Sequence, residues 1–130
     1  MNAKHECRRY LVSRSAITDL VSTRVRCGAL AVNETLPAIA IHQISETRET
    51  THDGAGLFRT LLQIDVVATN DSDLEEIASA LIVELHGYVG ALGNMYAQAI
   101  FLEDSFDEFD EEAQDGGEFI KRLEFVIMWN

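Results

Sequence analysis

The residues best suited to chemistry lie in one acidic segment near the C-terminus. Nine of the 16 residues from Glu103 to Glu118 are Asp or Glu. Carboxylates at this density could bind Ca²⁺, which takes several oxygen ligands from one loop, or could supply a catalytic acid and base. The EF-hand spacing of such ligands is absent from the segment. We therefore expect a solvated hairpin loop, with binding of a divalent cation as the minor alternative.

Two aromatic residues, Phe106 and Phe109, interrupt this acidic run. Aromatic side chains are unusual in a loop that serves only solubility, because they contribute most when they are buried. We expect them to pack on a partner protein or back onto the sheet. Acid–base catalysis by paired carboxylates would require a desolvated pocket, which a water-exposed loop does not provide. The segment therefore favours a role in interaction over catalysis.

The remaining reactive residues are scattered along the chain. They are four histidines and two cysteines: His5, His42, His52, His86, Cys7 and Cys27. Neither cysteine belongs to a CxxC motif, so two reduced thiols in a cytosolic protein are the simplest interpretation. GxSxG, HExxH and phosphate-binding glycine loops are also absent from the sequence. We expect no catalytic residue, no cofactor and no metal site.

Charge is distributed very unevenly. The net charge is −12, but residues 1–30 carry a net +4 and residues 31–130 a net −16. An acidic total argues against a nucleic-acid-binding protein. A basic end and an acidic body suit contacts between copies, although charge that only maintains solubility is the alternative. The candidate interaction residues are Arg8, Arg9, Arg14, Arg59, Asp107, Glu108, Asp110, Glu111 and Glu112.

Length and composition predict a single domain, 1–130. Apolar residues make up 47% of the chain and charged residues 25%, which is typical of a globular protein. Pro37 is the only proline, and neither a linker nor an internal repeat divides the sequence. No stretch approaches the ~20 apolar residues needed to cross a bilayer, so we expect no membrane partner.

Two helices are predicted from apolar spacing. The first covers residues 4–21, where apolar residues recur at helical intervals but Arg14 falls on the same stripe. The second begins at a Ser72/Glu75 capping box, continues with an apolar stripe to Leu85 and ends before Gly87. This second helix is the more strongly patterned of the two.

Four strands are predicted around a polar loop at 46–56 and the acidic segment. They cover residues 38–45, 57–69, 95–103 and 118–129, with a short strand at Val25 as a further option. The alternation in 57–69 places Arg59 and Asp65 on an outward face, where they are solvated or, in a ring, line a subunit contact or a channel. The fold class is therefore α+β: a mainly antiparallel sheet of about four to five strands, with two helices packed on one face.

The order of these segments resembles the tail completion family of long-tailed bacteriophages, also called tail terminator or tail-to-head joining proteins. The segments that carry the resemblance are Ser15–Val25, Leu36–Ile41, His52–Ala68, Leu74–Gly87, Ile100–Glu112 and Leu123–Trp129. Each segment is a common pattern alone. Their order, spacing and total length carry the resemblance, which covers nearly the whole chain.

The resemblance implies a virion structural protein that is not an enzyme. Members of this family form a hexameric ring that caps the head-proximal end of the tail tube, ends tube polymerisation and joins the tube to the neck or connector. The implied partners are further copies of the chain, the tail tube protein and the neck (stopper) protein, at the head–tail junction of a virion made in the host cytoplasm. DNA would pass through the channel without specific binding, and an acidic wall suits this because it repels phosphate.

Two other interpretations remain open for the sequence. One is another neck or tail adaptor protein of the virion with a similar fold. The other is a small enzyme or a calcium-dependent binding protein that uses the acidic segment. The missing nucleophile and base argue against the enzyme, and the location of the chain in a particle would separate the terminator from an adaptor.

Overall fold

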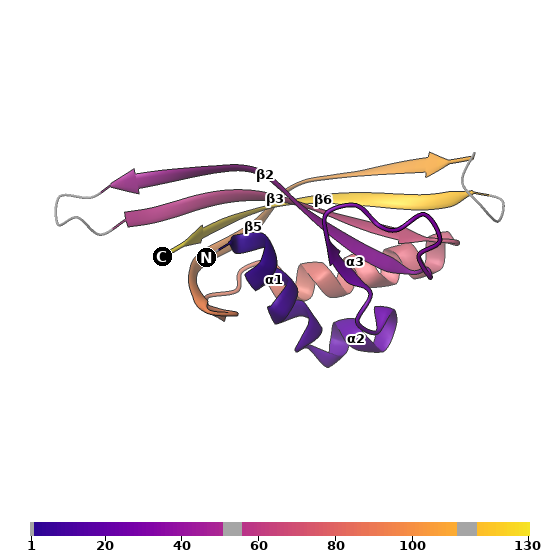
Figure 1. Cartoon of the computed structure of the whole chain (residues 1–130), viewed down its shortest axis with the longest axis horizontal. Helices are drawn as coiled ribbons and strands as arrows, with labels where there is room; N and C mark the ends of the chain where they lie inside the picture. The colour runs from indigo at the N-terminus through magenta and orange to yellow at the C-terminus, as the bar shows by residue number, and fades with distance from the viewer. Residues whose placement is uncertain (1, 51–55, 112–116) are drawn as a thin grey trace.

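The computed structural model describes residues 2–50, 56–111 and 117–130. Its elements are α1 (Ala3–Val12), α2 (Ser15–Val21), β1 (Val25–Cys27), β2 (Ala38–Thr50), β3 (Gly56–Ala68), α3 (Asp71–Leu85), β4 (Gly90–Leu92), β5 (Met95–Asp110) and β6 (Glu118–Trp129). The strands form one twisted sheet in the order β1-β2-β3-β6-β5-β4, and the three helices lie on one side of it (Figure 1). Strands β1 and β2 are parallel, and the other neighbouring pairs are antiparallel.

The predicted fold class was wrong in two respects. Within the described residues, the sheet has six strands and is mixed, whereas a mainly antiparallel sheet of four to five strands was expected, and three helices replace the expected two. The two shortest strands bring the four predicted strands to six: β1, which the sequence offered as an option at Val25, and β4, which it did not indicate. Three residues are too few to show an alternating pattern, so these strands depend on pairing with β2 and β5.

The third helix arises because the predicted helix at 4–21 is broken in the middle. Arg14 has an extended backbone, with φ −102° and ψ 119°. Ser13 ends α1, and its hydroxyl donates a hydrogen bond of 2.6 Å to the Tyr10 carbonyl. The break allows each half to bury its own apolar side, as Leu11 does for α1 and Ile17 for α2.

Helix α3 confirms the predicted stripe but not the predicted cap. Asn70 is the N-cap, and its side-chain oxygen accepts a hydrogen bond of 2.8 Å from the Asp73 amide. The Asn70 amide group in turn donates to the Asp73 carboxylate at 3.0 Å. The Ser72/Glu75 capping box was therefore wrong by two residues, because an Asn two positions earlier offers the same three-residue spacing. The helix ends at Leu85, before Gly87 with φ +82°, as expected.

Both long hairpins extend further than the sequence indicated. Strand β2 continues to Thr50 and β5 to Asp110, so much of the expected polar loop and of the expected acidic loop is strand. The predicted Asp53-Gly54 turn and Glu112 lie outside the described residues. The β2–β3 and β5–β6 hairpins extend in opposite directions from the middle of the sheet (Figure 1).

One apolar core lies between the sheet and the helices. Strands β3 and β6 contribute alternate side chains to it, among them Leu62, Ile64, Phe125 and Ile127. At one end of the core Phe58 stacks on Trp129, with ring centroids 4.5 Å apart. The alternation predicted for 57–69 is confirmed, because its apolar members face this core. None of the helices in the described parts of the chain combines the length and apolar character needed to cross a membrane.

Candidate interaction surfaces

The acidic segment forms the outer half of strand β5. Asp107 lies directly opposite Lys121 of β6, and the Lys121 amine approaches the Asp107 carboxylate to 2.9 Å. Opposite charges across a strand pair stabilise the pairing. The expectation of a solvated loop up to residue 110 was wrong because cations of β6 neutralise acids that look unpaired in the local sequence.

Two consecutive cations of β6, Lys121 and Arg122, contact side chains of β5 on both faces of the sheet. On the helix side, Lys121 also contacts Glu75 of α3 at 2.8 Å. On the other side, Arg122 contacts Glu108 at 2.6 Å and Asp65 of β3 at 3.6 Å. A hydrogen bond with Glu75 raises the pKa of Lys121, and one with Glu108 raises the pKa of Arg122. Both side chains therefore hold their charge more firmly in the fold.

The aromatic residues of the acidic segment divide between the two faces. Phe109 packs against Phe119 of β6, with centroids 4.8 Å apart, which confirms packing back onto the sheet for this residue. Phe106 lies opposite Arg122 on the helix-free face and is 42% exposed. Phe101, on the same face, is 39% exposed. The helix-free face thus presents apolar rings between its charges.

A buried carboxylate stands at the centre of the helix-free face. Asp65 accepts a hydrogen bond of 3.0 Å from Gln63 and lies 3.5 Å from the imidazole of His42. Burial raises the pKa of Asp65, against the lowering effects of Arg122, Gln63 and His42. A carboxyl group with a raised pKa beside a histidine could exchange a proton, but its contacts within the chain also give it a structural role.

A hollow of about 240 Å³ opens beside this carboxylate. The β1–β2 connection forms one wall of the hollow, and strands β2, β3 and β6 form the rest. Its lining residues are Ala29, Leu30, Ala40, His42, Asp65, Val67 and Glu118. Across the described ranges, no three His, Cys, Asp or Glu side chains come together as a metal site would require.

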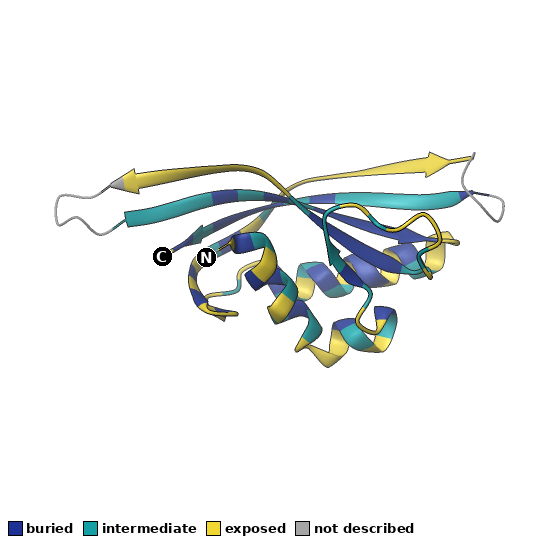
Figure 2. Cartoon of the chain, in the orientation of Figure 1, coloured by how far each residue is buried: buried dark blue, intermediate teal, exposed yellow. Residues whose placement is uncertain are grey.

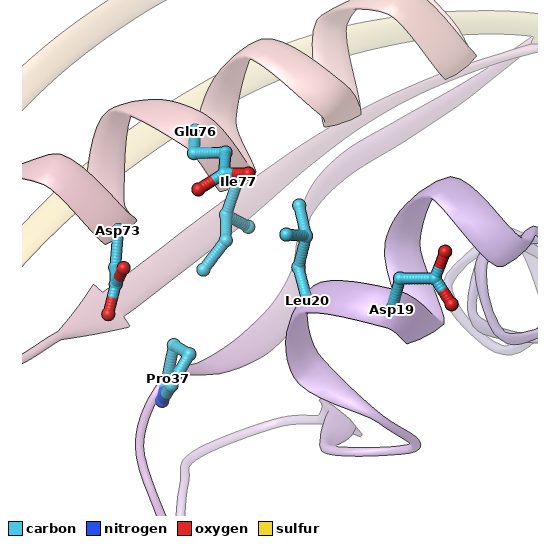
Figure 3. A pocket seen from close by; sticks show the side chains of 6 residues that line it. All are labelled: Asp19, Leu20, Pro37, Asp73, Glu76 and Ile77. Atoms are coloured by element: carbon cyan, nitrogen blue, oxygen red, sulfur yellow. The ribbon is translucent and has the colours of Figure 1, made fainter.

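A second hollow lies between α2 and α3 (Figure 3). It measures about 150 Å³, and Leu20, Ile77 and Pro37 gather around it. Asp73 and Glu76 of α3 add carboxylates to its wall. The combination of apolar and acidic groups would suit an alkyl chain that ends in a cation.

The predicted basic residues are mostly engaged within their own chain. The Arg8 guanidinium donates to the Val25 carbonyl at 2.7 Å, which ties α1 to β1. Arg14 contacts Glu84 of α3 at 2.9 Å and lies over the Tyr10 ring. Arg9 is exposed on α1. Arg8 and Arg14 therefore position the helices, although the Arg14 side chain is still 50% exposed, and Arg9 is exposed as well.

The other predicted residues lie along the hairpins. Arg59 is 3.7 Å from Glu103, and both side chains are well exposed. Asp110 ends β5 and Glu111 follows it, both exposed. Sequence reasoning missed His42, Lys121 and Arg122 as members of a charge cluster. A usable signal existed, since Lys121 and Arg122 are two of only four Lys or Arg residues after position 30.

No family model matches the chain, and no curated protein matches it in sequence. Among solved structures, the fold is similar to a chain described as "virion of native gene transfer agent (GTA) particle", with a TM-score of 0.66 and 12% identity. The match covers 98% of this chain and 94% of that chain. At this identity, the likeness shows that the two chains share a fold over almost their entire lengths.

Proposed function

We propose that the chain is a structural protein of a phage-like virion and that it forms a ring on the head-proximal end of the tail tube. The ring ends tube polymerisation and joins the tube to the neck or connector. The observation that carries this proposal is the end-to-end fold likeness to a chain from a gene transfer agent particle. The resemblance of the sequence to the tail completion family supports the more specific role.

The helix-free face of the sheet is suited to line the channel of such a ring. Residues that the strand registers place on this face include Glu49, Arg59, Asp65, Asp104, Glu108, Glu118, Arg122 and Glu124. Carboxylates outnumber the arginines, and those arginines contact carboxylates of the same chain. A negative wall repels the phosphates of passing DNA and prevents adhesion.

A non-enzymatic role is part of the same proposal. It rests on the absence of nucleophile and metal-binding motifs in the sequence. The strongest acid–base candidate, Asp65, contacts His42, Gln63 and Arg122 of its own chain, which favours a structural use of the cluster.

Deletion of the gene from the producing strain tests the proposed role. Without a terminator, we expect tail tubes of uncontrolled length that carry no heads, visible by negative-stain electron microscopy. The restored wild-type gene should return tubes of uniform length joined to heads, and serves as the control. Uniform, head-bound tails without the chain would contradict the terminator role. Normal heads and tubes of uniform length that are not joined to each other would indicate an adaptor instead.

A further inference from the structure

Strand β2 is covered on its outer side over only part of its length. Strand β1 pairs with Ile39–Ile41, and the Gly28 amide donates to the Ile41 carbonyl at 2.9 Å. In the parts of the chain that the structure describes, no strand pairs with the outer side of residues 42–50. Residues 43–49 of this half are exposed (Figure 2). Such an edge is a template for another strand.

Strand β5 has a matching open edge on the opposite side of the sheet. Strand β4 pairs with residues 95–97 of β5. The segment that precedes β4 in the chain covers the following residues of β5, up to Leu102. The Gly87 amide donates to the Ile100 carbonyl at 2.7 Å, and the Leu102 amide donates to His86 at 3.0 Å. Beyond Leu102, no strand among the described residues covers the outer side of 103–109.

We propose that the open edge of β2 in one copy pairs with the open edge of β5 in the next copy. Strands β2 and β5 run in opposite directions within the sheet, so copies in the same orientation pair antiparallel. The contact joins two different surfaces and can therefore repeat until a ring closes, leaving no open edge. This inference rests on the proposed ring and names the contact that builds it.

The charges favour this contact over pairing of identical edges. Two β5 edges together would oppose the acids Asp104, Asp107 and Glu108 of one copy with those of another, and like charges across a strand pair are destabilising. Two β2 edges together would leave every β5 edge open. The β2 segment carries Glu46 and Glu49 with Arg48, so it is nearly neutral and adds a cation for the acidic strand.

The joined edges must present the same face of the sheet. The Arg48 guanidinium lies over the ring of Phe58, which stacks on the core residue Trp129, so Arg48 is on the helix side. Asp107 is on the helix side too, because it shares Lys121 with Glu75 of α3. Arg48 of one copy can therefore lie directly opposite Asp107 of the next.

Charge then selects one register. With Arg48 opposite Asp107, the other pairs are Glu46 with Phe109, Thr47 with Glu108, and Glu49 with Phe106. No like charges meet in this register. A shift by two residues opposes either Glu46 with Asp107 or Glu49 with Glu108. A shift by one residue exchanges the two faces.

A disulfide between Thr47→Cys and Glu108→Cys, in a Cys27→Ser background, tests this register. Directly opposed residues of antiparallel strands have Cα atoms about 4.5–5.5 Å apart, which permits a disulfide. Within one chain, β3 and β6 lie between these two positions, and the registers also offset them by eight residues along the strands (Arg59 against Val67), so they are far beyond the reach of a disulfide. Because each copy carries both cysteines, oxidation of the concentrated purified protein should yield a ladder of covalent oligomers on a non-reducing gel.

Two further pairs of cysteine substitutions test the registers that are shifted by two residues. Thr47→Cys with Phe106→Cys, and Glu49→Cys with Glu108→Cys, should give no ladder above the level of the single-cysteine variants. Equal ladders from all pairs would overturn the register. No ladder from the Thr47/Glu108 pair, in protein that melts like the parent and whose cysteines react with maleimide, would overturn the edge contact.

The outcome is separable from that of the gene deletion. If tails need the chain but the Thr47/Glu108 pair does not cross-link, the terminator role stands and this contact fails. If the pair forms a ladder but tails are normal without the chain, the contact stands and the terminator role fails.

Discussion

The two faces of the central sheet are held by different forces. On the helix side, Leu62 of β3 and Phe125 of β6 are fully buried in the apolar core. The adjacent residues of the same strands, Gln63 and Glu124, turn to the helix-free side, where hydrogen bonds and ion pairs surround Asp65. Successive residues of a strand point to opposite faces, so one pair of strands serves both environments. Folding stability is therefore concentrated on the helix side, and the polar helix-free face is the one proposed to line the channel.

The largest expected effect is on the helix side. Phe125→Ala should lower the free energy of unfolding by about 3–5 kcal/mol, because it removes a large buried ring and leaves a cavity. The control is Glu124→Ala on the opposite face, with a change within about 0.5 kcal/mol. Urea denaturation measures both. A Glu124 variant that loses as much stability as the Phe125 variant would remove the distinction between the faces.

A smaller loss is expected from the ionic cluster of the helix-free face. Arg122→Ala removes the cation shared by Asp65 and Glu108 and should cost about 1–2 kcal/mol, again measured by urea denaturation. Arg59→Ala breaks an exposed pair with Glu103 and should cost at most about 0.5 kcal/mol. Equal losses from the two variants would show that the partly buried cluster contributes no more than a surface pair.

The buried carboxylate makes stability depend on pH in a defined direction. Because burial raises the pKa of Asp65 in the fold, its contribution is fully present below the unfolded pKa of about 3.9 and is lost as pH rises through the folded pKa. Asp65→Asn removes the charge and keeps the shape. The variant should therefore melt above the parent at neutral pH, with the difference vanishing below about pH 4. A variant that melts below the parent at neutral pH would contradict this account.

The smallest expected effect is on the chemical modification of cysteine thiols in and near the helix-side core. Burial, with a further contribution from Cys27, raises the pKa of the Cys7 thiol to about 12, so Cys7 should not react with maleimide in the folded protein. Cys27 is partly exposed and should react slowly, because burial also raises its pKa while Lys4 and Arg8 lower it. Mass spectrometry should find one modified thiol in the folded protein and two in denaturant. Rapid modification of both would show that the core is open.

The sequence predicted the central strands well because their pattern reports their environment directly. In 57–69 and 118–129, alternate apolar residues face the core as expected. The outer half of β5 escaped prediction because Lys121 and Arg122, which neutralise its acids, lie in the following strand. Local composition showed a charged loop, whereas cross-strand pairing determined the structure.

The candidate interaction residues were only partly predictable for the same reason. Arg8 and Arg14 look available in the sequence, yet they meet the Val25 carbonyl and the Glu84 carboxylate, both distant along the chain. The open edges of β2 and β5 have no sequence pattern at all. The edges are open because β1 covers only part of β2, and β4 covers only part of β5.

A cryo-electron microscopy reconstruction of the particle would test the central claim most directly. We expect this chain in a closed ring of six copies at the head–tail junction, with the helix-free face of each sheet toward the channel. A single copy, a ring at another position in the particle, or a particle without the chain would contradict the account.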